Sequence, residues 1–212
     1  MTNENSTQRS QFFAYLSRLR WIKRWGLMRN AEPENVMEHS WEVAVIAHSL
    51  GVIRNAYFGG QLDTAAIATT ALFHDTSEVL TGDLPTPVKY FHPSLTNAYR
   101  NLEQVAHEAL LQTLPPTLQT VYAPLLGEQH WPEEHRSVIK AADTLSAYLK
   151  CLRELQAGNQ EFAVAAKQLQ NKLLSLSLPE VGYFLEYFVA DCELTLDGLL
   201  LNCTAKIDGL NV

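Results

Sequence analysis

The chain has 212 residues, of which 47% are hydrophobic and 18% are charged, enough to bury the core of one folded domain. Asp and Glu number 23 against 16 Lys and Arg, and the resulting formal charge of -7 disfavours binding to a nucleic-acid polymer. A phosphate group bound by this chain would therefore need a few local cations or a metal ion to hold it.

The cysteines and the N-terminus bear on the cellular location. The three cysteines form no C-x-x-C pair, which argues against a disulfide framework and a thiolate zinc site: Cys151, Cys192 and Cys203. Residues 1–11 lack the apolar segment of a signal peptide, and no stretch reaches the roughly 18 apolar residues of a membrane span. We expect a cytoplasmic protein with no membrane attachment.

Apolar residues recur at helical spacing along most of the chain, and no alternating run is long enough to predict a sheet. We predict an all-α bundle that forms a single domain over residues 1–212. Its core spans about 11–190, with a polar tail at 1–10 and a C-terminal segment at 202–212 that frays. In chain order, helices are predicted at residues 12–25, 36–52, 65–80, 94–114, 116–126, 133–157, 161–176 and 181–201.

Two helix starts and one loop have clear local signals. Asn35 followed by Glu38 resembles a capping box, which opens the second helix and places His39 in its first turn. Asp63 or Thr64 can cap the third helix. The segment at 81–87 contains a glycine and two prolines and predicts a fixed, non-helical loop directly after that helix.

The most informative feature is the pair His74-Asp75, inside an otherwise apolar predicted helix and followed by Glu78. Buried charges are costly unless ion pairs, hydrogen bonds or a metal ion compensate them. A buried ion pair is the ordinary alternative to metal ligation here.

His39 and Asp143 supply candidate ligands from two other helices. Together with His74 and Asp75 they form a set of two histidines and two carboxylates, which suits a divalent transition metal with open positions for water and substrate. Taken singly, His39 could be an ordinary hydrogen-bonded histidine, and Asp143 could pair with a neighbouring lysine.

The order H…HD…D on helices resembles the HD-domain superfamily of metal-dependent phosphohydrolases. Further stretches resemble the bacterial 5′-deoxynucleotidases of the YfbR type, and the likeness runs from about residue 11 to residue 189. These stretches are FFAYLSRL at 12–19, WGLMRN at 25–30, ENVMEHS at 34–40, HDTSEVLTGDLPTPVKYF at 74–91 and KAAD at 140–143. Gly26 and Met37 depart from the family pattern.

The resemblance implies an all-helical homodimer that removes phosphate from deoxynucleoside 5′-monophosphates, discriminates against ribonucleotides and uses one divalent metal such as cobalt, manganese or copper. It implies four metal ligands: His39, His74, Asp75 and Asp143. It implies catalytic roles for Glu78, as acid or base near the leaving oxygen, for Arg24, which orients the phosphate, and for Asp75. The residues implied to contact substrate are Arg24, Trp25, His39, Asp75, Asp83, Leu84, Pro85, Thr86 and Asp143.

The residue types agree with these roles. A guanidinium can hold non-bridging phosphate oxygens, Glu78 could protonate the departing alkoxide, and the indole of Trp25 could leave no room for a 2′-hydroxyl. Other interpretations stay open: Arg24 as a helix-dipole partner, Trp25 as core, Glu78 as a hydrogen-bond partner behind a ligand histidine, and Thr86 as a turn residue. The remaining histidines are interpreted as structural or solvated: His48, His92, His107, His130 and His135.

Two rival functions remain at this level. One is an HD-type hydrolase of another nucleotide, such as a nucleoside triphosphate, a cyclic dinucleotide or a stringent-response nucleotide. These usually need more basic residues or a second metal set, and the sequence shows neither. The other is a non-catalytic module that binds metal and nucleotide without turnover, against which Glu78 and Arg24 argue.

Overall fold

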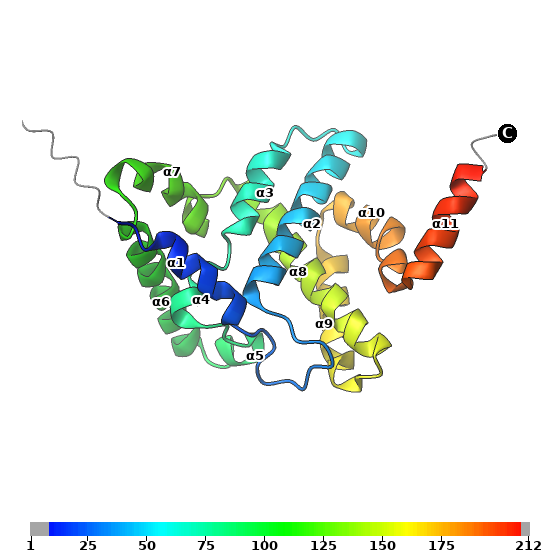
Figure 1. The fold of residues 1–212 in the computed structure, drawn as a ribbon, viewed down its shortest axis with the longest axis horizontal. Coiled ribbons are helices and arrows are strands. Elements are labelled where there is room, and N and C mark those ends of the chain that lie inside the picture. Colours follow the sequence, from blue (N-terminus) through cyan, green and yellow to red (C-terminus); the bar gives the residue numbers. More distant parts are fainter. Residues whose placement is uncertain (1–8, 209–212) are drawn as a thin grey trace, which may run out of the picture.

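The computed structural model describes residues 9–208. In this part of the chain helices joined by turns and loops are the only regular elements, apart from one isolated bridge between Lys23 and Asn35 (Figure 1). The α-helices are α1 (Phe12–Leu16), α2 (Val36–Tyr57), α3 (Thr64–Leu72), α4 (Glu78–Thr81), α5 (Thr86–Lys89), α6 (Pro93–Gln112), α7 (Pro116–Leu126), α8 (Glu133–Gln156), α9 (Ala163–Ser175), α10 (Pro179–Tyr187) and α11 (Leu196–Asp208). The all-α prediction is confirmed.

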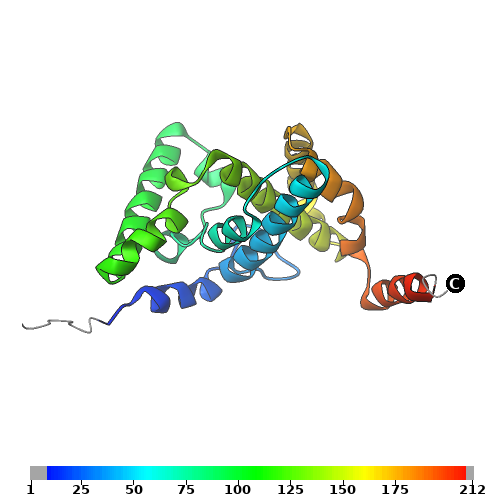
Figure 2. The ribbon, with the colours of Figure 1, turned by 90° about the horizontal axis from the view of Figure 1, so that it is seen from above.

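Helices α2 and α8 form the centre of the molecule. Buried residues of α2, such as Val43 and Leu50, pack with Ile67 of α3 and with Ile139 and Leu145 of α8 in the main core cluster. Figures 1 and 2 place α6 and α7 at one end of the molecule and α11 at the other, while α9 packs beside α8 and α10 packs beside α2 and α9. No helix in the described part is long and apolar enough to cross a membrane.

The predicted capping box is present at the start of α2. The Asn35 side chain accepts the Glu38 backbone N–H at 3.0 Å, and the Glu38 carboxylate accepts the Asn35 N–H at 3.4 Å. The helix runs past the predicted end at residue 52 to Tyr57, and Gly51, inside it, lets α3 approach. A Cβ at Gly51 would lie 2.9 Å from Cγ2 of Thr64. The helix start therefore depends on local sequence, and the close packing of α2 with α3 depends on Gly51.

The prediction of one helix over 12–25 is wrong beyond Leu16. A 3₁₀ turn at Ser17–Trp21 follows α1, and Ile22 is extended. This extended segment pairs with the chain just before α2: the Arg24 N–H donates to the Glu34 carbonyl, and the Val36 N–H donates to the Ile22 carbonyl, each at 3.0 Å. Pairing with a distant segment therefore replaces the local helical bonds.

The prediction of one helix over 65–80 is also wrong, because α3 ends at Leu72 and α4 begins only at Glu78. The Thr76 hydroxyl donates to the Phe73 carbonyl at 2.8 Å, and a ring nitrogen of His74 lies 2.8 Å from the Ala71 carbonyl oxygen. Such side-chain bonds to the backbone compete with a regular helix. His74 and Asp75 therefore lie on a tight turn between two helices.

In the C-terminal third, too, the observed helices differ from the predicted ones. The predicted helix at 181–201 is two helices, α10 and α11, separated by a 3₁₀ turn at Ala190–Glu193. Residues 202–208, predicted to fray, belong to α11. The predicted loop at 81–87 is shorter at both ends, because Thr81 is the last residue of α4 and Thr86 and Pro87 open the short helix α5.

The other predicted helices are confirmed within a few residues as α6, α7, α8 and α9, the last one preceded by a 3₁₀ turn at Gln160–Phe162. The single-domain extent over 1–212 stays a prediction. Residues 1–8 of the polar tail and residues 209–212 lie outside the described residues.

Candidate active site

His39 and Asp143 meet where α2 crosses α8. His39 lies in the first turn of α2 and is 1% exposed. Its Nε2 atom lies 3.1 Å from Oδ1 of Asp143, which belongs to α8. The packing of the two central helices thus brings together two residues that are separated by about half of the sequence.

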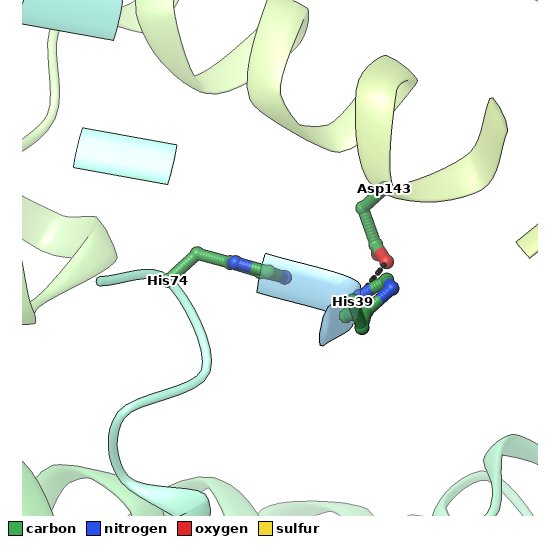
Figure 3. A group of neighbouring side chains, drawn as sticks. All are labelled: His39, His74 and Asp143. Atoms are coloured by element: carbon green, nitrogen blue, oxygen red, sulfur yellow. Dashed lines mark ion pairs between the residues drawn. The ribbon is translucent and has the colours of Figure 1, made fainter. Parts of the chain in front are cut away.

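The turn between α3 and α4 adds His74 and Asp75. Oδ2 of Asp75 lies 3.1 Å from Nε2 of His74 and 3.5 Å from Nε2 of His39. The candidate ligand atoms of His39, His74 and Asp143 all lie within 4.8 Å of one another, and Figure 3 shows these three side chains converging from three parts of the chain.

This cluster fits a divalent metal ion. Nε2 of His39 and Nε2 of His74 are buried, and neither has a hydrogen-bond partner of good geometry. Buried polar atoms without partners are rare in folded proteins and require an explanation. Two imidazole nitrogens beside carboxylate oxygens form a donor set that transition metals and zinc accept.

The carboxylates are held in the form that a metal needs. Burial raises the pKa of Asp143, but the neighbouring imidazoles of His39 and His74 outweigh it and lower that pKa to about 2. For Asp75, burial is likewise outweighed, chiefly by His74, and its pKa lies well below the usual range. Asp75 in turn raises the pKa of His74 to about 9 against the effect of burial. A cation entering the site would displace that proton.

Arg24 lies beside the cluster, in the non-helical segment that follows the 3₁₀ turn at Ser17–Trp21. Because it is at no helix end, the interpretation as a helix-dipole partner is wrong. Its Nε donates to Oε1 of Glu34 at 2.7 Å, and its Nη1 lies 3.5 Å from Oδ2 of Asp75. Glu34 is 9% exposed and was not singled out from the sequence, because only the tertiary pairing places it behind Arg24.

Glu78 and Asp83 lie near both Asp75 and Arg24. Glu78 opens α4 and is 9% exposed, and its Oε2 is buried without a hydrogen-bond partner. Burial, together with the negative charges of Asp75 and Asp83, raises the pKa of Glu78 well above its ordinary value. Burial is also the main reason why the pKa of Asp83 is raised. A protonated Glu78 can donate a proton.

Trp25 adopts φ +58, a left-handed conformation that costs a non-glycine residue about 1–3 kcal/mol. Its ring packs against Phe162 with centroids 5.3 Å apart, which agrees with a core contact. The backbone N–H of Trp25 lies near the Asp83 carboxyl and lowers its pKa, against the larger effect of burial. Leu84 and Pro85 follow Asp83 on the partly buried loop, and Thr86 is exposed.

Two further residues of the site lacked a motif that would identify them. Ser146 follows Asp143 by three residues, and Glu42 follows His39 by three, so each lies one helical turn from a candidate ligand. That one-turn spacing is the signal in the sequence that could have identified them.

Of the histidines interpreted as structural or solvated, His48, His92 and His130 are exposed and His107 and His135 are partly buried.

The fold and the cluster define an HD-domain phosphohydrolase. The structure is similar to an HD-domain phosphohydrolase from Listeria innocua, with a TM-score of 0.74 and 26% identity, over 94% of this chain and 97% of that one. It also shares its fold with the cyanophage S-2L HD phosphohydrolase DatZ, solved bound to dA and one catalytic Zn²⁺ ion, with a TM-score of 0.59 and 23% identity over 87% and 99% of the two chains.

The sequence comparisons narrow the class to one family. The family model of YfbR-like 5′-deoxynucleotidases matches residues 11–192. A 5′-deoxynucleotidase of Klebsiella pneumoniae is 50% identical over 188 residues, which cover 89% of this chain and 94% of that protein. The 5′-deoxynucleotidase YfbR of Salmonella arizonae is 50% identical over 190 residues, covering 90% and 96%. The chain belongs to the YfbR-like 5′-deoxynucleotidase family, as its motifs predicted.

Proposed function

We propose that the protein hydrolyses deoxyribonucleoside 5′-monophosphates to deoxyribonucleosides and phosphate, selects against ribonucleotides and uses one divalent metal ion. Family membership gives the reaction class, hydrolysis of a phosphomonoester. The observation that carries the proposal is the pair of buried Nε2 atoms of His39 and His74, which lack hydrogen-bond partners and lie beside ionised carboxylates.

The metal would be held by His39, His74, Asp75 and Asp143, and the family resemblance favours cobalt, manganese or copper. A divalent ion in this position lowers the pKa of water and offsets charge on the phosphoryl oxygens. An acidic protein can then bind a phosphate group despite its net charge of -7.

Arg24 orients the phosphate. Glu34 holds Nε of Arg24, so one edge of the guanidinium is fixed while Nη1 lies on the side of Asp75. A fixed guanidinium favours two-point contact with non-bridging phosphate oxygens. Oδ2 of Asp75 lies near Arg24 as well as near His39 and His74, so the phosphate held by Arg24 would lie next to the metal ion.

Glu78 acts as the general acid at the leaving 5′-oxygen. Its raised pKa supports this role, because a shift in that direction favours the protonated carboxyl group, which can donate to a departing alkoxide. Burial and two neighbouring carboxylates are the physical cause, and the same pattern sets Glu78 apart from the ionised Asp75.

Trp25 and the loop after α4 bind the nucleoside. Asp83 accepts a hydrogen bond from a sugar hydroxyl, while Leu84, Pro85 and Thr86 face the nucleoside. The indole of Trp25, supported by Phe162, occupies the space of a 2′-hydroxyl. Burying that hydroxyl without a partner would cost a ribonucleotide about 1–3 kcal/mol.

The family resemblance also implies a homodimer, with a small-molecule substrate and no nucleic-acid polymer as partner. Light scattering on the purified protein measures its mass in solution. A mass twice that of the 23.8 kDa chain supports the dimer, and the mass of one chain contradicts it.

The reaction is tested by measuring phosphate release from matched deoxy and ribo 5′-monophosphates, first after chelation and then with cobalt, manganese, copper, magnesium or zinc restored. Metal-dependent release from the deoxy series alone is the expected result. No phosphate release with any of these metals would contradict the proposal and favour a non-catalytic module. Trp25→Ala should admit ribonucleotides, and unchanged sugar selectivity in this variant would exclude Trp25 from the discrimination.

A further inference from the structure

The second ring nitrogen of His39 has a buried partner of its own. Nδ1 of His39 lies 3.1 Å from the hydroxyl oxygen of Ser146, which is 0% exposed. Ser146 lies on α8 one turn after Asp143. The same face of α8 thus presents a carboxylate near one nitrogen of His39 and a hydroxyl to the other.

Behind Ser146 lies an ion pair that connects the two central helices. The Ser146 hydroxyl donates to Oε2 of Glu42 at 2.6 Å, and Glu42 lies on α2 one turn after His39. Arg153 of α8 donates to both oxygens of Glu42, at 2.8 and 3.3 Å. Burial opposes ionisation of Glu42, but the bonds from Arg153 and Ser146 outweigh it and lower its pKa.

The direction of these hydrogen bonds follows from what each group can do. An ionised carboxylate only accepts, so Glu42 requires the single proton of the Ser146 hydroxyl. The hydroxyl oxygen, having given its proton to Glu42, can only accept from His39. Nδ1 of His39 must therefore carry a proton, and in a neutral imidazole the lone pair is then on Nε2.

We propose that Ser146, held in place by Glu42 and Arg153, is a positioning residue that fixes His39 with its proton on Nδ1 and the lone pair of Nε2 directed at the metal. This inference rests on the proposed function, since it assigns these residues a role toward the metal site.

No competing acceptor for Nδ1 lies at hydrogen-bond distance among the described residues. The nearest carboxylate oxygen, Oε1 of Glu34, is 3.8 Å away and already accepts from Arg24. The orientation of His39 therefore depends on the hydroxyl of Ser146.

His74 is oriented by a different means. Its Nδ1 lies 2.8 Å from the carbonyl oxygen of Ala71, and a carbonyl only accepts. The proton of His74 is thus fixed by backbone that no substitution removes, whereas that of His39 depends on side chains. Loss of the partner behind a ligand histidine typically weakens metal binding by about 10–100-fold.

The test measures Co²⁺ affinity by competition with a chelating dye, together with the visible absorption spectrum of bound Co²⁺. Ser146→Ala removes the hydroxyl. Glu42→Gln keeps the shape but lets the new amide donate to Ser146, which reverses the hydrogen-bond direction. Thr144→Val is the matched control, because Thr144 is also buried on α8 and its hydroxyl donates only to the Lys140 carbonyl of the same helix, at 2.8 Å.

We expect Ser146→Ala and Glu42→Gln each to weaken Co²⁺ binding by about 10–100-fold and to change the Co²⁺ spectrum. Thr144→Val should leave both unchanged. Because Ser146 and Glu42 belong to one series of connected hydrogen bonds that ends at His39, the double variant should bind Co²⁺ no more weakly than Ser146→Ala alone. Urea unfolding of each variant establishes that it folds, and Glu42→Gln carries the test if Ser146→Ala does not.

Wild-type Co²⁺ affinity in Ser146→Ala or Glu42→Gln would overturn the positioning role and leave the proposed function standing. An equal loss in Thr144→Val would also overturn it, since the effect would then come from disturbing α8. If the wild-type protein binds none of cobalt, manganese, copper or zinc, the proposed function itself fails, and the positioning role fails with it.

Discussion

Lys150 offers the sharpest test of how the site is supported. It lies inside α8 and is 2% exposed, and its ammonium group donates to the Glu154 carboxylate and to the Glu32 carbonyl. Glu154 also accepts the backbone N–H groups of Ala31 and Glu32, at 2.8 and 3.0 Å. This buried pair anchors the segment that leads to Glu34, the partner of Arg24.

Lys150→Met keeps the aliphatic length near the ring of Phe162 but leaves Glu154 without its cation. Breaking a buried ion pair by removing one partner costs about 3–5 kcal/mol. Glu154 retains N–H donors from Ala31, Glu32 and Asn159, which places the expected loss near the lower end, about 3 kcal/mol. Urea unfolding monitored by circular dichroism measures the free energy of unfolding.

The matched control is the double variant Lys150→Met/Glu154→Gln. It removes the uncompensated charge, and its single amide oxygen still accepts one of the two backbone N–H groups that donate to different oxygens of Glu154, so it should recover about 1 kcal/mol relative to Lys150→Met. The reasoning is refuted if Lys150→Met unfolds with wild-type stability, or if the double variant is less stable than Lys150→Met.

Three more predictions follow from the site and its supports. Burial opposes ionisation of Glu154, but Lys150 and its other donors lower its pKa from 4.5 to about 2. Its stabilising contribution is therefore complete above 4.5 and lost as the pH falls through about 2, so the stability gap between wild type and Glu154→Gln should shrink by about 3 kcal/mol between about pH 5 and pH 2. Asn35→Ala removes the capping box and should lower the free energy of unfolding by about 1 kcal/mol in urea titrations, whereas Asn35→Ser should retain most of it. Glu78→Gln should lower kcat for deoxynucleotide hydrolysis by about 10²–10⁴-fold with metal content unchanged, and wild-type turnover would remove Glu78 from the mechanism.

The sequence predicted features that depend on nearest neighbours and on residue type. Asn35 and Glu38 specify the start of α2 through bonds between adjacent residues, so the capping box could be read directly. The residue types of His39, His74, Asp75 and Asp143 predicted a cluster suited to a metal, because imidazole nitrogens and carboxylate oxygens together suit a divalent transition metal.

The tertiary structure decided what depends on distant partners. The chain breaks helical geometry around His74 and Asp75 because side chains there bond to the backbone, and it leaves the helix before Arg24 because that segment pairs with the one before α2. Glu34 and Ser146 gained roles only when the crossing of α2 and α8 placed them against Arg24 and His39. Sequence periodicity reports which face of a helix is apolar, while the crossing of two helices fixes which polar groups on those faces become partners.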